Sequence, residues 1–176
     1  MTTRKADGFA LIDLIFVCGV IGLISSIALP RLVLAKQAAG AASAIGSLRT
    51  VASAQLTFAL TCGNGFYAPD LRTLGTPPPS SNEPYISPDM SAANVIQKSS
   101  YTFRLEGLPY AGAPLTCNGL AAGEAARGYR AAADPTEPNN VRFFAINSTA
   151  QLYEHNETLY DDIPEVGEPL IGEAIR

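Results

Sequence analysis

The sequence predicts an α+β protein in which one long N-terminal helix packs on a small antiparallel sheet of three to four strands. Three observations lead to this fold class. Residues 9–29 form a run of about 21 residues that is apolar almost throughout. Residues 31–61 are rich in good helix formers. Residues 101–155 contain short segments that alternate apolar and polar side chains, as half-buried strands do.

The apolar run is long enough to cross a membrane as a helix, because about 20 residues span the hydrocarbon core. A buried helix of a soluble protein is the alternative, but such a helix rarely carries apolar residues on every face. A secretory signal peptide has a shorter apolar region followed by a cleavage site. We therefore expect 9–30 to be a transmembrane helix. Arg4 and Lys5 precede it and the next basic residue is Arg31, which favours a cytoplasmic N-terminus.

Residues 31–61 continue the helix as an amphipathic segment. Pro30 lies between the two halves and removes a backbone donor, so we expect a kink or a local opening of the helix there. The apolar residues of the segment recur at steps of three and four, which predicts one buried face. They are Leu34, Ala38, Ala41, Ala42, Ile45, Leu48, Val51, Ala52, Leu56 and Ala59.

Asp13 is the one ionisable residue of the apolar run. A carboxylate at membrane depth costs about 2.5–3.5 kcal/mol on insertion scales, so it normally has a partner. No basic residue lies within reach on the same helix face. If the chain were cut between Gly8 and Phe9, a new α-ammonium would appear four residues before Asp13. That charge on a neighbouring subunit could pair with the carboxylate, which would then favour assembly.

The stretch GFALIDLIFVCGVIGLISSIALP resembles the N-terminal motif of type IV pilins and type II secretion pseudopilins. The resemblance implies a leader peptide at 1–8, cleavage by a prepilin peptidase after Gly8 and N-methylation of Phe9. It also assigns Asp13 and Pro30 to the assembly helix. The implied protein is a filament subunit that starts in the inner membrane with a cytoplasmic N-terminus. An inner-membrane assembly platform then adds it to a periplasmic or extracellular filament, which forms by self-polymerisation.

The family usually has Glu where this chain has Asp13, so the pairing involves a side chain that is shorter by one methylene. A pilus pilin and a secretion pseudopilin are not distinguished by the sequence. The alternative function is a single-pass membrane-anchored extracytoplasmic binding domain, for which the helix is only a tether. A tether gains nothing from a carboxylate within the membrane, so Asp13 favours the filament subunit.

The three cysteines fit an extracytoplasmic protein. Cys18 lies within the apolar run and is interpreted as a small apolar packing residue. Cys62 and Cys117 lie beyond it, and an oxidising compartment favours a disulfide between them over two free thiols. No Cys-x-x-Cys pair is present, so the sequence gives no indication of a zinc site.

The rest of the chain reads as loop, sheet and tail. Residues 62–100 are expected to be a Pro-rich connecting loop with a short helical turn near Asp70–Leu74. The sheet region, 101–155, holds strand candidates in SYTFRLEG and GYRAAADP, and two more on either side of a turn at Asn147-Ser148-Thr149. Residues 156–176 are expected to be a mostly irregular acidic tail.

Composition argues against several functions. The formal net charge is −4 and no basic cluster is present, so nucleic-acid binding has no electrostatic support. His155 is the single histidine, and without a nucleophile motif or a phosphate-binding loop we predict neither an enzyme nor a cofactor.

The acidic tail raises the question of a metal. Asp161, Asp162 and Glu165 offer the oxygen ligands that calcium prefers, but their spacing matches no defined loop, so a solvated acidic cluster is the preferred interpretation and no metal site is predicted. Asn147 and Asn156 begin Asn-x-Ser/Thr sequons, which matter only where a glycosylation machinery exists.

Overall fold

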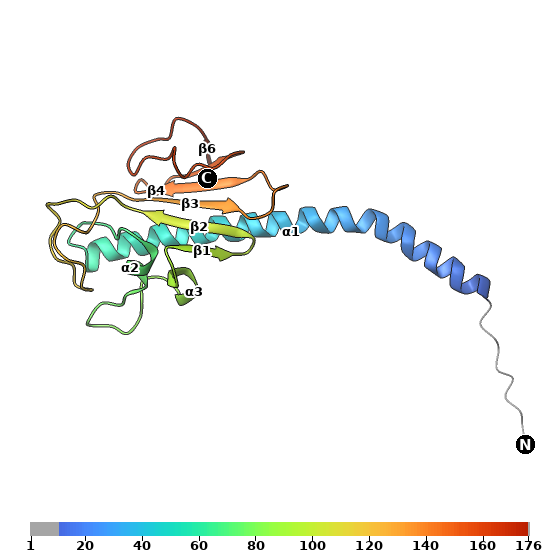
Figure 1. Cartoon of the computed structure of the whole chain (residues 1–176), viewed down its shortest axis with the longest axis horizontal. Helices are drawn as coiled ribbons and strands as arrows, with labels where there is room; N and C mark the ends of the chain where they lie inside the picture. Colours follow the sequence, from blue (N-terminus) through green and yellow to red (C-terminus); the bar gives the residue numbers. More distant parts are fainter. Residues whose placement is uncertain (1–10, 176) are drawn as a thin grey trace, which may run out of the picture. The chain divides into compact units, whose positions relative to one another are not determined.

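The computed structural model describes residues 11–175, which fall into two compact units that meet in the sequence between Ala39 and Gly40. Helix α1 (Leu11–Thr61) begins in the first unit and ends in the second (Figure 1). The second unit adds the short helices α2 (Leu71–Gly75) and α3 (Pro88–Ser91) and one antiparallel sheet. The predicted α+β class is confirmed at this level. The short helical turn predicted near Asp70 is α2, and the Asp70 carboxylate caps it by accepting from the Thr73 N–H at 2.8 Å.

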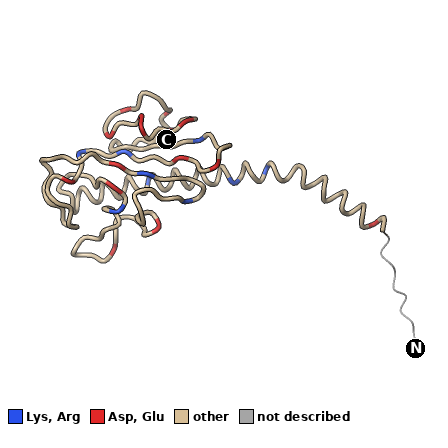
Figure 2. Tube along the Cα trace, in the orientation of Figure 1, with Lys and Arg blue, Asp and Glu red and all other residues tan. Residues whose placement is uncertain are grey.

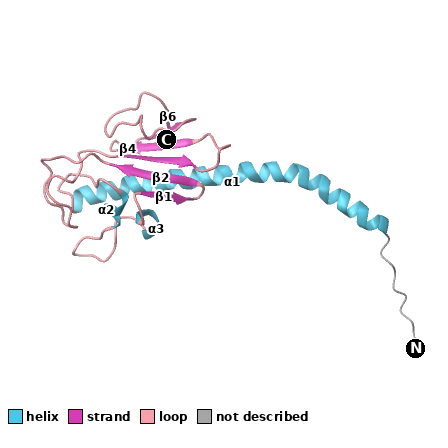
Figure 3. Cartoon of the chain, in the orientation of Figure 1, coloured by secondary structure: helices cyan, strands magenta, loops and turns pink. Residues whose placement is uncertain are grey.

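The sheet has six strands, so the predicted number of three to four was wrong. The strands are joined in sequence order, β1 to β6, and each pairs antiparallel with the next (Figure 3). Their bounds are Val95–Lys98, Tyr101–Glu106, Arg130–Pro135, Phe143–Asn147, Leu152–His155 and Glu173–Ile175. β2 to β5 lie where strands were expected. β1 lies in the segment expected to be loop, and β6 lies in the tail expected to be irregular.

The part of α1 in the second unit packs on one face of the sheet. Its buried positions follow a helical repeat and are Gly40, Ala41, Ala44, Leu48, Val51, Ala54, Gln55, Phe58 and Ala59. The predicted face was therefore correct in part. Leu56 was expected inside but is 54 % exposed, because it lies two residues, or about 200° around the helix axis, from both Ala54 and Phe58, which are buried. Leu34 was also expected inside and is exposed within the first unit.

A second, smaller core covers the opposite face of the sheet. Successive residues of a strand point to opposite faces, so Ala131 and Ala133 face α1 while Ala132 faces away. Residues 156–172, which we call the strap, supply Leu159 and Ile163 to this second core. The strap then leads into β6 at the sheet edge. The tail predicted to be irregular thus has no long element but is packed on the sheet.

Two polar residues hold the strap in place. The Asn147 side-chain amide donates to the Pro164 carbonyl at 2.9 Å and to the Gly167 carbonyl at 2.7 Å. The Ser148 hydroxyl donates to the Glu165 carbonyl. Asn147 is fully buried, so the first residue of this sequon has a structural role. The sequence offered only the turn at Asn147–Thr149 as a hint of it.

Glycine is needed at position 40 because the β1–β2 turn approaches α1 closely there. A Cβ atom added at Gly40 would lie 2.9 Å from the Ser99 carbonyl oxygen. Ser99 and Ser100 both have positive φ angles, of 50° and 64°, as the favoured two-residue hairpin turns require. The Ser43 hydroxyl donates to the Ser99 hydroxyl at 2.9 Å, which fixes the turn against the helix.

Gln55 is a buried polar residue whose replacement should destabilise the second unit. Its amide nitrogen donates to the Ala68 carbonyl at 2.8 Å, and its amide oxygen accepts from the Ala68 N–H at 2.9 Å. In Gln55→Leu both backbone groups of Ala68 lose their partner inside the protein, at about 1–3 kcal/mol each. We expect unfolding to become easier by roughly 3 kcal/mol after the gain from burying leucine.

Denaturant unfolding followed by near-UV circular dichroism of the tyrosines checks this expectation, because all seven tyrosines lie in the second unit. The matched control is Gln97→Leu, at an exposed position of β1, which should change the free energy of unfolding by less than about 0.5 kcal/mol. Equal effects of the two substitutions would contradict the role assigned to Gln55.

Candidate functional site

The first candidate site is the apolar half of α1, residues 11–30. It contains the one segment among the described residues that is long and apolar enough to cross a membrane, and none of the most apolar window is buried within the chain. Large side chains such as Leu11, Phe16 and Leu23 are more than 70 % exposed. Asp13 is the one charged residue of this half, and the next is Arg31; the charged positions along the chain are coloured in Figure 2. The helix is thus a candidate membrane anchor.

Asp13 has no hydrogen bond and no ion pair with any other residue in the range 11–175. Its side chain is exposed on a helix whose neighbouring side chains are apolar. Gly8 and Phe9, the predicted cleavage and methylation residues, lie outside the described residues. The Asp13 carboxylate therefore has no partner among the described residues, and the side chains around it are apolar and exposed.

Helix α1 continues through Pro30 without interruption (Figure 1). A proline nitrogen cannot donate to the carbonyl four residues earlier, here that of Ser26. Residues on both sides remain helical, so the local opening expected at Pro30 is absent. The Ser26 hydroxyl donates back to the Leu23 carbonyl at 2.8 Å, which keeps this polar side chain satisfied on an apolar helix.

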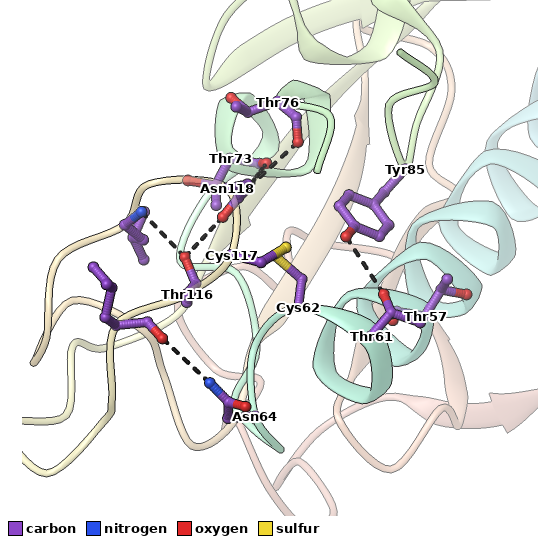
Figure 4. Close-up of a disulfide and its surroundings, with 12 residues drawn as sticks. Thr57, Thr61, Cys62, Asn64, Thr73, Thr76, Tyr85, Thr116, Cys117 and Asn118 are labelled. Atoms are coloured by element: carbon purple, nitrogen blue, oxygen red, sulfur yellow. Dashed lines mark hydrogen bonds between the residues drawn. A yellow bond between two sulfur atoms is a disulfide. The ribbon is translucent and has the colours of Figure 1, made fainter. Parts of the chain in front are cut away.

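The second candidate site is the disulfide-linked end of the second unit (Figure 4). Cys62 follows the last residue of α1 and is bonded to Cys117, with a Cα–Cα distance of 4.9 Å and a sequence separation of 55. The predicted bridge is thereby confirmed. Cys18 is free and exposed on the apolar half of α1. Cys18 can act as a small apolar packing residue, as the sequence suggested, only if another molecule covers this face of α1.

Polar contacts around the bridge hold the loop that carries Cys117. The Asn118 amide donates to the carbonyls of Thr73 and Thr76 at 3.0 and 3.3 Å, which joins the loop to α2 (Figure 4). The Asn64 amide donates to the Leu115 carbonyl at 3.2 Å. The Cys117 N–H also donates to the Cys62 carbonyl at 3.1 Å. The end of α1, α2 and the loop at 115–120 therefore form one linked body.

The acidic residues considered for calcium do not form a site. The Glu165 carboxylate accepts from the Leu108 N–H, while Asp161 and Asp162 are exposed. No group of three His, Cys, Asp or Glu side chains that could hold a metal ion occurs among the described residues. His155 ends β5 and lines a surface cavity with Arg142 and Glu154, which are engaged with each other in an ion pair of 2.5 Å.

The charged residues on the outer face of the sheet have a structural role that the sequence did not reveal. Arg130 and Glu106 form an ion pair of 2.6 Å across β3 and β2, and the Tyr160 hydroxyl donates to Glu106 at 3.1 Å. The hydrogen bond from Arg130 lowers the pKa of Glu106. Burial raises the pKa of Tyr160, whose ring lies against the guanidinium groups of Arg104 and Arg130 at 5.2 and 5.1 Å. These contacts fasten the strap.

Comparison of the chain with family models, with curated proteins and with solved structures finds no match. The function must therefore be inferred from the chain's own residues. Asp13 is an unpartnered carboxylate, among the described residues, on an exposed apolar helical segment. The C-terminal part of the same helix belongs to the unit that contains the sheet and the disulfide.

Proposed function

We propose that this chain is a structural subunit of a type IV pilus-like filament or of a type II secretion pseudopilus. In this proposal a prepilin peptidase matures the chain, and an inner-membrane platform polymerises it through α1. The observation that carries the proposal is Asp13. It is the sole ionisable residue of an otherwise apolar and exposed helical segment, and it has no partner within the described residues.

The energetics favour assembly over a lone subunit. A carboxylate at membrane depth costs about 2.5–3.5 kcal/mol on insertion scales, and a chain that keeps such a residue must recover that cost elsewhere. Cleavage after Gly8 would create an ammonium on Phe9, and the ammonium of one subunit could pair with Asp13 of the next. A pair of opposite charges in a low-dielectric bundle attracts much more strongly than the same pair in water.

Small residues on the same helix support close packing between copies. A Cβ atom added at Gly19 or Gly22 meets no other atom within 4 Å, so these positions are open on the surface of the helix. Gly19, Gly22 and Ser26 follow one another at steps of three and four residues and share a face. Helices in membranes associate through such small residues because their backbones can then approach closely.

The second unit has the properties of the part that remains outside the membrane. It has its own core and carries a disulfide, and disulfides persist mainly in oxidising compartments. This arrangement fits a periplasmic or extracellular domain on a membrane-derived helix.

Intact-mass spectrometry of protein extracted from the membrane tests the maturation step. In a host with an active prepilin peptidase, we expect a mature species that lacks residues 1–8 and carries one methyl group on Phe9. In Gly8→Val the leader should be retained, because the branched side chain replaces the glycine at the cleaved bond. If the unmodified chain keeps its leader in such a host, the maturation step is wrong and the tether function is favoured.

A further inference from the structure

A cavity of about 410 Å³ opens beside the part of α1 that lies in the second unit. Its rim is exposed and its floor is buried. Its lining residues come from α1, from β4 and the turn that follows it, and from two tyrosines in loops, one of which directly precedes β3. They are Arg49, Ala52, Ser53, Leu56, Tyr67, Tyr129, Ile146, Ser148 and Ala150. Cavities of this size, with apolar walls and few polar groups, are typical of small-molecule sites.

The floor contains a hydrogen-bond donor without a protein partner. Tyr129 is only 2 % exposed, and its hydroxyl forms no hydrogen bond with any group in the range 11–175. All fully buried polar side-chain atoms of the described residues have a partner, so the Tyr129 hydroxyl is not fully buried, and Tyr129 lines the cavity. Burial raises the pKa of Tyr129 well above its usual range, so the phenol remains protonated and can donate.

The wall beside this donor is aromatic and aliphatic. The Tyr67 and Tyr129 rings meet edge to face, with 5.2 Å between their centroids. Leu56, more than half exposed, and Ile146, fully buried, complete the apolar surface. A flat aromatic ring is the group that such a wall accommodates best, since aromatic pairs gain energy beyond their buried area.

The rim provides one positive charge. Arg49 is exposed and forms no ion pair and no hydrogen bond through its guanidinium among the described residues, although the chain as a whole is acidic. A guanidinium binds a carboxylate through two parallel hydrogen bonds. The Ser148 hydroxyl is already engaged with the Glu165 carbonyl. The Ser53 and Tyr67 hydroxyls also line the cavity, but Arg49 supplies its one charge and Tyr129 its deeply buried donor.

We propose that this cavity binds a small aromatic carboxylate. Arg49 binds the carboxylate at the rim, the ring packs against Tyr67 and Leu56, and the Tyr129 hydroxyl donates to an acceptor at the far end of the molecule. The proposal is independent of the filament function, because each of these residues belongs to the second unit.

The probe for the test is 4-hydroxybenzoate, which carries a carboxylate, a ring and a hydroxyl acceptor. Ligand-observed NMR titration of the full chain in neutral maltoside micelles should show saturable binding. We expect Arg49→Gln to weaken binding at least about tenfold and Tyr129→Phe by roughly fivefold. The matched control is Arg72→Gln on α2, which removes an exposed arginine outside this cavity and should leave the dissociation constant unchanged.

A second probe separates the charge from the ring. The neutral 4-hydroxybenzamide should bind more weakly than 4-hydroxybenzoate to the unmodified chain, and Arg49→Gln should reduce this difference. Arg49 also borders a groove of about 650 Å³ with Thr57 and Ser81. Thr57→Val should therefore leave binding intact. The proposal would be overturned if 4-hydroxybenzoate showed no saturable binding, or if Arg49→Gln and Tyr129→Phe both bound it as well as the unmodified chain does. It would also be overturned if Thr57→Val lost binding while Tyr129→Phe kept it.

Discussion

Replacing Asp13 by alanine is expected to lower the yield of assembled filaments at least tenfold while leaving a folded, membrane-inserted subunit. In the proposed contact the Asp13 carboxylate pairs with the ammonium of Phe9 on the adjacent subunit. Breaking a buried ion pair by removing one partner costs about 3–5 kcal/mol, because the other charge is left without compensation. Each 1.4 kcal/mol corresponds to about a tenfold change in an equilibrium constant. Part of that cost is therefore enough to lower the filament yield tenfold.

Two further variants separate charge from shape. Asp13→Asn keeps the size of the side chain but removes its charge, so it should assemble as poorly as Asp13→Ala. Asp13→Glu restores the carboxylate on a longer side chain and should assemble at least as well as the unmodified chain. The measurement is the amount of sheared or secreted filament at matched subunit expression, with near-UV circular dichroism as the control for folding. Normal filament yield from Asp13→Ala would show that the carboxylate makes no assembly contact.

Removing the disulfide should destabilise the second unit by about 4 kcal/mol. The bond closes a loop across 55 positions of sequence, and the chain-entropy model gives about this value for such a loop. For a domain of this size the loss corresponds to a decrease of roughly 10–15 °C in the unfolding midpoint. The double variant Cys62→Ala with Cys117→Ala measures it, with unfolding again followed through the tyrosines of the second unit.

The matched control is Cys18→Ala, which removes the free thiol of the apolar half of α1 and should not move the midpoint. A reducing agent should shift the midpoint of the unmodified chain by about as much as the double variant does, and should not shift that of the double variant. An unmodified chain whose midpoint is insensitive to reduction would contradict a stabilising role for the bridge.

Local patterns in the sequence were sufficient for the elements that have enough residues to show them. β2 alternates Tyr101, Phe103 and Leu105 inward, and this alternation over six residues predicted the strand. β1 and β6 have only four and three residues, and both lie at the edges of the sheet. A strand that short has too few residues for a period of two to be distinguished from an irregular loop. β5 also has four residues, but the turn at Asn147–Thr149 indicated a hairpin and so predicted it.

Packing between distant segments could not be predicted in the same way. Ala132 and Ala145 form part of the outer core because the strap covers them, yet alanine carries no strong preference for that position. Gln55 was missed because its partner is the backbone of Ala68, which no side-chain pattern reveals. The cavity near Tyr129 likewise depends on how α1 meets the β4–β5 turn. The disulfide between Cys62 and Cys117, by contrast, could be predicted, because an oxidising compartment favours a bridge between the two cysteines that lie beyond the apolar run.

The position of the bridge also determines how the second unit would behave under mechanical tension, as a filament subunit experiences when its fibre is pulled. A force applied at the two ends of this unit cannot stretch the segment between Cys62 and Cys117 while the bond is intact, because the load passes through the sulfur atoms. The sequence separation of 55 corresponds to roughly 190 Å of extended chain. The oxidised unit therefore releases that much less length when it yields, and a fibre built from it would extend less before it breaks.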